Sequence, residues 1–378
     1  MDDALGDDLH AAESTEAYHR AVPTPQNANG LPEFARPPVT GDLTPFIATL
    51  VSGRTLGLEE SQAAFACLMS GECHHAEVGA LLALMATRIP TADELAGAAS
   101  AMRAHVDRLD TGVPASALLD TAGTGGTAKL FNVSTVAAII AAAAGAKVAK
   151  HGNRSRTGRG SAEVLMQLGV NIDAGRETQR RCMDEAGICF CFAIHHHPAT
   201  RHVMPVRKAL GIPTIFNLLG PLTNPAGARR QIVGVYAPQF VRPVADALAI
   251  LGVERAIVMH GLDGLDECSI SSPTMIAEVS NGSVTERVLT TNDLGVAVAP
   301  HSALIVGDLE DAANLLMSIL NGNERGARRD MAVVNAGLAI MAAGLVDDLP
   351  SGMRLATAAI NDGAAAQTME RLRTASNH

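Results

Sequence analysis

The segment DTAGTGGTAKLFNVST, residues 120–135, combines residue types that predict anion binding. Glycine has no side chain and adopts turns closed to other residues, so backbone amides in a glycine-rich loop can approach an anion closely. Polar residues then open an apolar helical pattern, and a helix N-terminus binds phosphate through its unpaired N–H groups. The loop glycines are Gly123, Gly125 and Gly126, and the polar residues are Asn132, Ser134 and Thr135. The segment predicts a phosphate or pyrophosphate site, and it is not a Walker loop because no Gly-Lys-Ser/Thr follows.

A second loop, KHGNRSRTGRGS, runs from Lys150 to Ser161 directly after a predicted strand. Its lysine and arginines supply local positive charge in a chain whose formal net charge is -10. Ligands of α/β proteins usually bind at the carboxyl ends of the strands. We therefore interpret this loop as part of the binding site, with a solvated basic loop as the alternative.

Three successive histidines, His195, His196 and His197, precede a helical segment that carries Arg207. Neighbouring side chains on an extended chain point in different directions, which argues against a shared metal ion. A guanidinium on a helix at a cleft can hold a planar carboxylate by two hydrogen bonds. Arg207 is therefore a candidate for carboxylate binding, and an ordinary surface ion pair is the alternative.

A fourth segment, HGLDGLDECS, follows another predicted strand and carries the adjacent carboxylates Asp266 and Glu267. Mg²⁺ is typically held by one or two carboxylates together with substrate phosphates. The pair is therefore a candidate magnesium site, although an acidic turn would have the same composition.

The elements that must position these four segments differ between the two parts of the chain. Apolar residues recur at helical spacing from Thr44 to about residue 108, and β-like runs alternate with helices from Leu118 onward. The runs are 146–149, 188–192, 231–236 and 255–259, and the intervening helices are 134–144, 161–168 and 241–251. Alternation of strands and helices is typical of a parallel sheet. The predicted fold class is α/β, with a small all-helical N-terminal domain and a larger α/β domain with a mostly parallel central sheet.

The expected domain boundaries follow these changes in pattern. Residues 1–41 are polar and lack periodicity, so we expect a flexible N-terminal extension. A helical domain is expected over 42–115, with the helical segment 198–211 returning to pack on it. The α/β domain is expected over 116–197 and 212–378. A cleft between the two domains is where a small-molecule site is expected.

Composition excludes several classes of protein. The chain has 39 acidic and 29 basic residues and 3% aromatic residues, which disfavours nucleic acid as a partner. Six scattered cysteines lack metal-site spacing and are interpreted as thiols. The start of the chain does not resemble a signal peptide, and the longest apolar run, 133–146, is too short to span a bilayer. We therefore expect a cytoplasmic protein without membrane segments.

Taken in order, these segments resemble anthranilate phosphoribosyltransferase, a family of the tryptophan pathway. The resemblance covers about residue 45 to the end. It rests on GTGG with FNVST, KHGNRS, HPATRHVMPVR, FNLLGPLTNP and GLDE. It implies transfer of a 5-phosphoribosyl group from phosphoribosyl pyrophosphate to anthranilate, which gives N-(5-phosphoribosyl)anthranilate and pyrophosphate. It also implies Mg²⁺ as cofactor and a homodimer formed through the helices.

The resemblance further implies a role for each residue that matches the family's motifs. The implied donor-binding residues are Gly123, Gly125, Gly126, Thr127, Asn132, Ser134, Thr135, Lys150 and Ser161. The implied acceptor-binding residues are His151, Asn153, His197 and Arg207. The implied magnesium ligands are Ser134, Ser161, Asp266 and Glu267. Lys150 and Arg207 are the implied catalytic residues.

Both donor loops depart from the family's usual pattern. The family usually reads Gly-Thr-Gly-Gly-Asp-Gly, whereas Thr127 and Ala128 follow Gly126 here, and the interval before Asn132 is one residue shorter. The basic loop is also one residue shorter between Arg154 and Ser161. Two alternatives therefore accompany the main prediction: a relative with a different aromatic acceptor, and a binding protein of the same fold without transferase activity.

Overall fold

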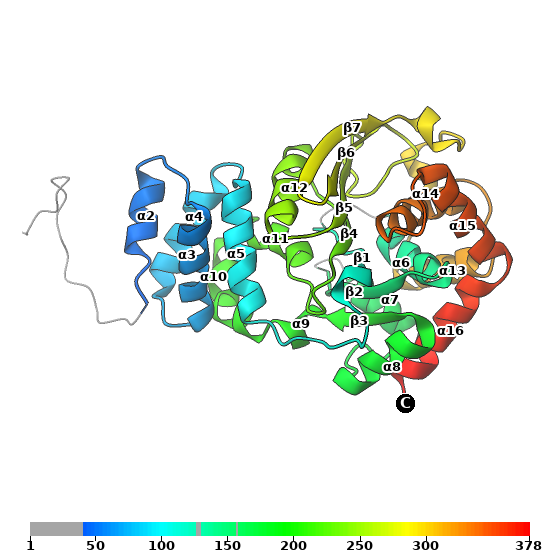
Figure 1. The fold of residues 1–378 in the computed structure, drawn as a ribbon, viewed down its shortest axis with the longest axis horizontal. Helices are drawn as coiled ribbons and strands as arrows, with labels where there is room; N and C mark the ends of the chain where they lie inside the picture. The colour runs from blue at the N-terminus through cyan, green and yellow to red at the C-terminus, as the bar shows by residue number, and fades with distance from the viewer. Residues whose placement is uncertain (1–40, 126–129, 156–157) are drawn as a thin grey trace, which may run out of the picture. The chain divides into compact units, whose positions relative to one another are not determined.

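The computed structural model describes residues 41–125, 130–155 and 158–378, and residues 41–378 form one compact unit (Figure 1). The extension predicted over 1–41 therefore lies outside the described residues, except for Gly41. The predicted donor residues Gly126 and Thr127 also lie outside them.

Four helices come first along the described chain. They are α2 (Thr44–Val51), α3 (Leu58–Ser70), α4 (His75–Ala86) and α5 (Ala92–Ala104). Helix α3 ends at Gly71, which has the left-handed φ of 77° that glycine adopts without strain. Helix α5 begins after Thr91, whose hydroxyl accepts from the Glu94 amide while the Glu94 carboxylate accepts from the Thr91 amide.

A seven-stranded sheet follows, in the order β3-β2-β1-β4-β5-β6-β7. Its strands are β1 (Leu118–Asp120), β2 (Lys147–Gly152), β3 (Ile188–Phe192), β4 (Arg230–Gly234), β5 (Arg255–Gly261), β6 (Thr274–Ser280) and β7 (Ser283–Leu289). Strands β1 to β5 pair in parallel, and β6 and β7 pair antiparallel at one edge. The mostly parallel sheet and the helical N-terminal region confirm the predicted fold class.

Further helices lie between and after the strands, and several of them cover the two faces of the sheet (Figure 1). They are α6 (Val133–Ala143), α7 (Ser161–Gln167), α8 (Arg176–Ala186), α9 (Ala193–His196), α10 (Met204–Leu210), α11 (Phe216–Leu219), α12 (Val241–Ile250), α13 (Leu309–Leu320), α14 (Ala327–Ala342), α15 (Leu349–Asn361) and α16 (Ala364–Ser376). Among the described residues, no helix is long and apolar enough to cross a membrane.

Alternate residues of the central strands enter two different cores, as the pleat of a strand requires. Ile232 of β4 and Ile257 of β5 pack with α6 and α13 to α16. Val233 and Val258 face the other side, where α12 joins the sheet to α5. One core thus continues from the sheet into the N-terminal helices. The segment 199–210, expected to be one helix, is a 3-10 helix, η3 (Pro198–His202), followed by α10, which packs on α4.

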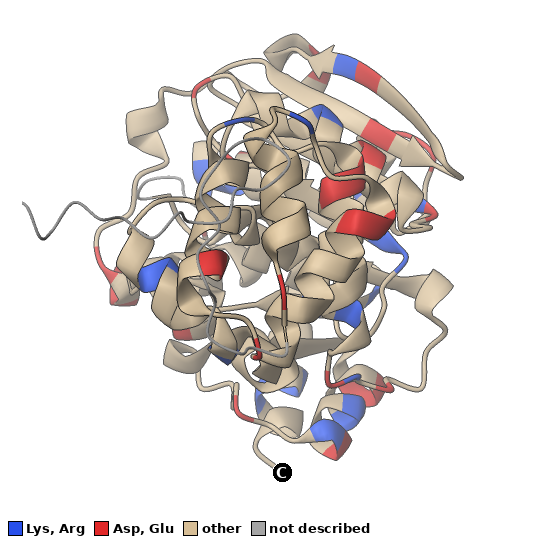
Figure 2. Cartoon of the chain, turned by 90° about the vertical axis from the view of Figure 1, so that its left-hand side faces the viewer, with Lys and Arg blue, Asp and Glu red and all other residues tan. Residues whose placement is uncertain are grey.

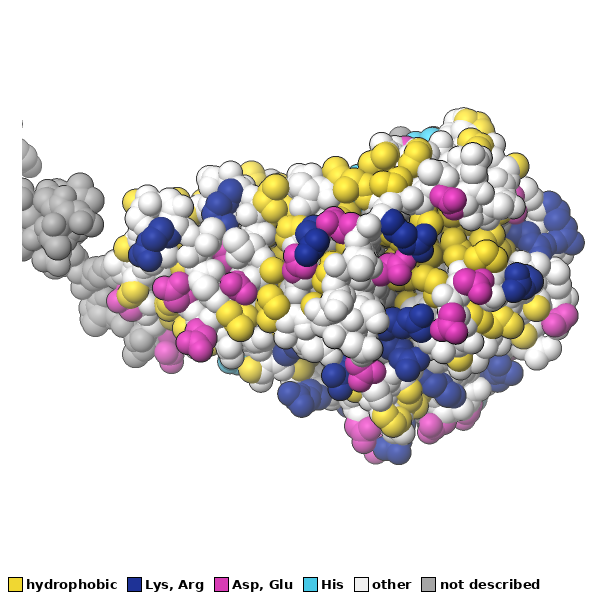
Figure 3. Space-filling model, turned by 45° about the horizontal axis from the view of Figure 1, so that its top comes forward, with side chains coloured by type: hydrophobic (Ala, Val, Ile, Leu, Met, Phe, Trp, Pro, Cys, Tyr) yellow, Lys and Arg dark blue, Asp and Glu magenta, His cyan; other side chains and the backbone are white. Residues whose placement is uncertain are grey.

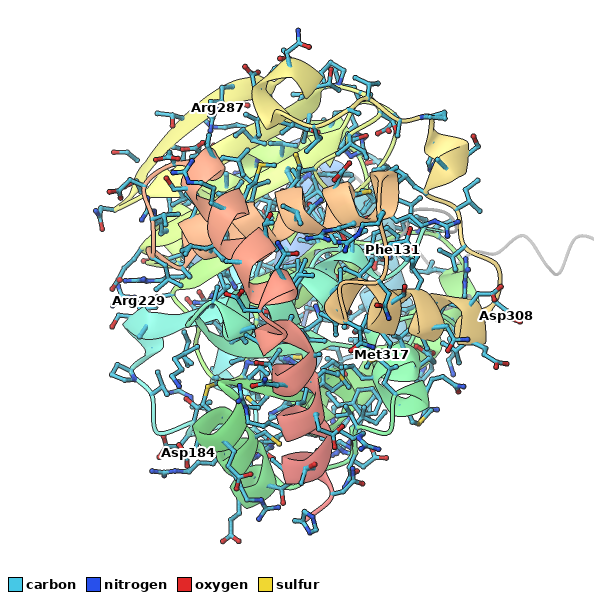
Figure 4. All side chains as sticks on the ribbon, turned by 90° about the vertical axis from the view of Figure 1, so that its right-hand side faces the viewer. Phe131, Asp184, Arg229, Arg287, Asp308 and Met317 are labelled. Carbon is cyan, nitrogen blue, oxygen red and sulfur yellow. The ribbon has the colours of Figure 1, made fainter. Side chains whose placement is uncertain are left out.

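Acidic and basic side chains are interspersed over the described residues. Figure 2 shows lysines and arginines among aspartates and glutamates on the side that bears the N-terminal helices. The face in Figure 3 shows the same mixture, with hydrophobic side chains between the charges. Figure 4 shows the opposite side, where the C-terminal helices lie and where Met317 of α13 is labelled.

Candidate active site

The carboxyl ends of β1 and β2 are joined by a buried carboxylate that the sequence analysis did not single out. Asp120 ends β1 and is 1% exposed. Its carboxylate accepts hydrogen bonds from the His151 amide at 3.0 Å, the Ala122 amide at 3.1 Å and Asn224 Nδ2 at 2.8 Å. Asn224 Nδ2 also donates to the Ala149 carbonyl at 2.8 Å. Asp120 and Asn224 therefore fix the end of β2, from which Lys150 and His151 extend.

Lys150 is a buried cation on the donor side of β2. Its Nζ donates to Thr121 Oγ1 at 3.0 Å, and its side chain is 2% exposed. Burial lowers the pKa of Lys150 to about 8, opposed by the negative charges of Asp120 and Glu267. Burial raises the pKa of Asp120 to about 6, opposed by the Asn224 hydrogen bond and by Lys150. At pH 7 both groups are mainly ionised, so Lys150 presents a positive charge and Asp120 a negative one.

The glycine-rich loop packs against the end of β4. A side chain at Gly123 would meet the Gly234 carbonyl at 3.0 Å, and that carbonyl accepts from the Thr124 amide at 2.8 Å. A Cβ on Gly234 would overlap the backbone of Asp266. Close backbone approach therefore requires glycine at both positions. Gly125, with a φ of 64°, needs glycine for its conformation.

A small pocket lies where this loop meets the start of α6. It is lined by Thr121, Gly123, Ser134, Ala137, Ile232, Gly234, Met259, Asp266, Glu267 and Asn335. The Ser134 amide, in the first turn of α6, donates to Glu267 Oε1 at 3.1 Å. Burial and the neighbouring charge of Asp266 raise the pKa of Glu267 to about 8. Asp266 and Glu267 are therefore neighbouring carboxyl groups, and ionisation of Glu267 is disfavoured.

The remaining donor-side residues connect the two loops. Asn132 precedes α6, and its Nδ2 donates to the Arg159 carbonyl at 3.0 Å, so the basic loop lies at the start of this helix. Thr135 is 1% exposed, and its hydroxyl has no hydrogen-bond partner within the described part of the chain. Ser161 begins α7, and a Cβ on Gly152 would come within 2.4 Å of its hydroxyl. The Ser161 hydroxyl thus lies at the end of β2.

His151 and His197, two of the acceptor-binding residues that the resemblance implies, lie side by side in the structure. Their rings lie 5.0 Å apart, and they are 4% and 7% exposed. His151 Nδ1 contacts the Gly220 carbonyl at 3.1 Å, while neither Nε2 has a hydrogen-bond partner among the described residues. Burial lowers the pKa of His151 to about 3 and that of His197 to about 4, so both rings are neutral at pH 7. Two unsatisfied ring nitrogens indicate a site for a polar ligand.

Arg207 lies on α10 without an ion pair to any described residue. Its guanidinium packs over the Phe216 ring, 5.0 Å from the centroid, and Nη1 contacts Met204 Sδ at 3.7 Å. Burial lowers its pKa, although an arginine stays protonated at neutral pH. Among the described residues, Arg207 therefore does not form the ordinary surface ion pair that was the alternative to carboxylate binding. Asn153 is exposed, and its Oδ1 accepts from the Arg154 amide.

The three successive histidines have three different environments. His195 contacts Asp173 at 2.7 Å, and His197 faces His151. His196 is fully buried and contacts the Asp107 carbonyl, Arg176 and Gln179. The rings diverge as expected, but the expected reason was wrong, because His195 and His196 lie in the short helix α9 rather than on an extended chain.

Asn335 of α14 also contributes to the site and was missed as a functional residue. It is fully buried, lines the pocket, accepts from the Cys268 amide at 2.9 Å and donates to the Cys268 carbonyl at 3.0 Å. It thus fixes the residue that follows Glu267. Asn224 had a signal in the sequence, because it stands near the end of the motif FNLLGPLTNP, but its partners lie far away along the chain.

The comparisons with known proteins agree with this architecture. Residues 44–106 match the helical bundle domain of the glycosyl transferase family, and residues 115–366 match its α/β domain. The chain is thus a member of this class of transferases. A crystal structure of anthranilate phosphoribosyltransferase from Thermus thermophilus is 39% identical, with a TM-score of 0.82, over 88% of this chain and 99% of that one.

Sequence relatives identify the particular family. Anthranilate phosphoribosyltransferase of Rubrobacter xylanophilus is 46% identical over 322 residues, covering 85% of this chain and 93% of the relative. The Rhizobium meliloti enzyme is 45% identical over 338 residues, covering 89% and 99%. A Saccharomyces cerevisiae enzyme in complex with PRPP and Mg is 25% identical, with a TM-score of 0.79, over 89% and 98%. The chain belongs to the anthranilate phosphoribosyltransferase family, which confirms the resemblance found in the sequence.

Proposed function

We propose that this chain transfers the 5-phosphoribosyl group of phosphoribosyl pyrophosphate to the amine of anthranilate, in tryptophan biosynthesis. The observation that carries this proposal is the arrangement of two successive side chains at the end of β2. Lys150 extends toward the glycine loop and the two carboxylates, and the next residue, His151, extends toward His197. Successive side chains of a strand point to opposite faces, so one strand end serves a phosphate site and an aromatic site at once.

The donor-side residues suit Mg²⁺. Asp266 and Glu267 offer hard oxygen ligands, and the hydroxyls of Ser134 and Ser161 are further oxygen donors. The raised pKa of Glu267, caused by burial and by Asp266, marks a position where a cation would stabilise both carboxylates. In this proposal these four residues hold the metal. The chemistry that a bound Mg²⁺ supplies is neutralisation of charge on the pyrophosphate.

In the proposed reaction, the bond between the ribose anomeric carbon and pyrophosphate breaks while the anthranilate nitrogen forms a bond to that carbon. Negative charge therefore grows on the leaving group. In this proposal Lys150 stabilises the leaving group by its preorganised positive charge. The amides of the glycine loop and of the first turn of α6 stabilise it as hydrogen-bond donors. The donor set completing this cradle is Gly123, Gly125, Gly126, Thr127, Asn132, Ser134 and Thr135.

The acceptor is positioned by residues on the other side of β2. Arg207 binds its carboxylate by two hydrogen bonds, and the neutral rings of His151 and His197 lie beside its ring and amine, with Asn153 at the rim. An aniline nitrogen is nearly neutral and nucleophilic, so the reaction needs no strong general base. Catalysis by this chain is then mainly orientation and electrostatic stabilisation.

Three further features belong to the proposal. The protein acts as a homodimer formed through its N-terminal helices, and it works in the cytoplasm. The division into a helical domain over 42–115 with 198–211, and an α/β domain over the rest, describes two parts that meet at the substrates. Because both donor loops differ in length from the family's usual pattern, we expect the affinity for the donor to be the property in which this chain differs most from the family.

The proposal is tested by the loss of anthranilate fluorescence with phosphoribosyl pyrophosphate and MgCl₂. We expect saturable, metal-dependent consumption of anthranilate, and a donor titration that reports the affinity of the shortened loops. A panel of other aminobenzoates run in parallel identifies the preferred acceptor. A folded protein that consumes no anthranilate at saturating donor, or that prefers another acceptor, would contradict the proposal.

A further inference from the structure

Two cysteine side chains meet at the end of α3, away from the site described above. A side chain at Gly41 would meet Cys67 Sγ at 2.7 Å and Cys73 Sγ at 3.0 Å, so both sulfur atoms pack against the same glycine. Cys67 is close enough to Cys73 to contribute to the raised pKa of the Cys73 thiol. Cys67 belongs to α3, and Cys73 lies beyond the turn at Gly71, where it pairs with Gly41 in a parallel bridge.

This pair differs from the other cysteines in its access to solvent. Cys67 and Cys73 are both partly exposed, whereas Cys182, Cys189, Cys191 and Cys268 are buried. Cys189 and Cys191 on β3 are also neighbours, since Cys189 raises the pKa of the Cys191 thiol, but both are fully buried. Of the two neighbouring thiol pairs in the described part of the chain, only the pair at α3 is partly exposed.

The surroundings of the pair select the kind of oxidant. Glu72 and Glu77 place negative charge near Cys73 and, together with burial, raise the pKa of its thiol. A thiol with a raised pKa is the poorer nucleophile, so we take Cys67 as the attacking sulfur. The same carboxylates repel anionic disulfides such as oxidised glutathione. A small neutral peroxide is not repelled.

We propose that Cys67 and Cys73 are an oxidation-sensitive dithiol that hydrogen peroxide converts to a disulfide. Cys67 sulfur attacks one peroxide oxygen, the O–O bond breaks, and Cys67 sulfenic acid and one water form. The Cys73 sulfur then displaces the hydroxyl from the Cys67 sulfur, which gives the disulfide and a second water. Two thiols and one peroxide thus become one disulfide and two waters, and the peroxide takes both electrons.

The disulfide is expected to affect the acceptor side of the site, an effect that rests on the proposed function. An S–S bond of about 2.05 Å is shorter than a non-bonded contact between two sulfurs, so the disulfide is expected to pull on the turn between Cys67 and Cys73. That turn packs on η3: a side chain at Gly71 would overlap the His202 ring, at 2.4 Å from Nδ1. His202 lies between His197 and Arg207. Oxidation should therefore raise the KM for anthranilate by about threefold or more, with little change for the donor.

The test treats the folded, reduced full-length protein with hydrogen peroxide or oxidised glutathione, followed by alkylation and non-reducing peptide mapping. We expect a peptide pair linked through Cys67 and Cys73 and lighter by two hydrogens, formed faster with peroxide and reversed by dithiothreitol. Cys189 and Cys191 should remain alkylatable only after unfolding, as the internal control. Sulfinic acid at Cys67 without a disulfide, or a disulfide formed equally fast with glutathione, would overturn the proposal.

Cys67→Ser and Cys73→Ser are the matched variants for the kinetic effect. Both should keep the KM of the reduced wild type after peroxide treatment, while oxidised wild type shows the higher anthranilate KM until it is reduced. An unchanged anthranilate KM in protein shown to carry the disulfide would refute the effect on the acceptor side. Peptide mapping needs no turnover, so failure of the proposed reaction is distinguishable from failure of the dithiol.

Discussion

At the scale of single residues, Arg207 is a cation whose charge no described residue neutralises, so it is available to bind a ligand. Its guanidinium stacks on Phe216 and forms no ion pair with a described residue. Loss of a charged hydrogen bond costs about 1.5–3 kcal/mol, which corresponds to roughly ten- to a hundredfold in affinity. Arg207→Ala should therefore raise the KM for anthranilate by that factor and change the donor KM much less, as measured by steady-state titration of each substrate.

The control for this prediction is Lys208→Ala, which removes an exposed charge from the next position of α10. It should leave both Michaelis constants close to wild type. If Arg207→Ala instead raised the donor KM more than the acceptor KM, Arg207 would not belong to the acceptor side.

Substitution of both Asp266 and Glu267 is expected to abolish activity without lowering stability. Asp266→Asn with Glu267→Gln should abolish turnover, because both proposed charged metal ligands are lost. The same change removes the Asp266 charge and a Glu267 carboxyl whose ionisation is disfavoured by burial and by Asp266, so the thermal midpoint without metal and donor should not fall. Activity is measured by anthranilate fluorescence, and stability by thermal unfolding in EDTA.

Asp347→Asn, at an exposed carboxylate, is the matched control and should leave both activity and midpoint unchanged. A double variant that retained wild-type turnover would exclude these two carboxylates as the magnesium ligands. A midpoint that fell sharply would instead indicate that they stabilise the fold.

The sequence predicted those site residues whose chemistry is local. Gly123, Ser134 and Lys150 lie in motifs where neighbouring residues already indicate phosphate binding. Asp120 and Asn335 were missed because their roles come from partners on other elements, such as His151 and Cys268. A single aspartate at the end of a short strand has no pattern of its own. Its importance is visible only once the sheet has placed β2 beside it.

At the scale of elements, the loop that carries Glu267 depends on α14. Asn335 pairs with both backbone groups of Cys268, and it donates to the Met331 carbonyl of its own helix. Asn335→Ala would leave a buried N–H and a buried carbonyl unpaired, at a cost of about 1–3 kcal/mol each. We expect a lower free energy of unfolding, by about 2–6 kcal/mol, and a higher Mg²⁺ concentration for half-maximal activity.

Chemical denaturation and a MgCl₂ titration measure these two effects. Asn361→Ala, near the end of α15, removes an exposed amide and should change neither. If Asn335→Ala lowered stability but left the Mg²⁺ dependence unchanged, Asn335 would only support the fold.

The prediction of elements succeeded where apolar periodicity is strong and failed at one edge of the sheet. Strands β2 to β5 were found from their apolar runs, whereas β6 and β7 were not predicted. Their signal was present as Asn281-Gly282, which has φ values of 48° and 85° and lies between the two strands. Asn-Gly at such a position is typical of a tight hairpin turn. The antiparallel edge was missed because it lacks the repeat of strand and crossover helix from which the other strands were predicted.

At the scale of the whole molecule, buried neutral histidines link the acceptor side and the core to pH. Burial lowers the pKa of His151 to about 3 and those of His196 and His197 to about 4, from an ordinary 6.5. As pH falls below 6.5 the unfolded chain takes up protons that the folded chain does not. The contribution of these neutral rings to the free energy of unfolding is therefore fully present above pH 6.5. It is lost progressively between pH 6.5 and about 4, by about 1.4 kcal/mol per pH unit for each ring.

His196 isolates this effect because it lies outside the proposed substrate contacts and is held by Asp107, Arg176 and Gln179. His196→Asn should lower the free energy of unfolding at pH 7, since an amide cannot replace all of these hydrogen bonds. It should also flatten the fall in stability between pH 7 and pH 5 by about 2 kcal/mol, because one proton-uptake site of the unfolded chain is gone. His195→Asn, at a neighbouring exposed ring, serves as the control measured by denaturation at the same pH values. An unchanged pH slope in His196→Asn would mean that folded His196 takes up its proton as readily as the unfolded chain does.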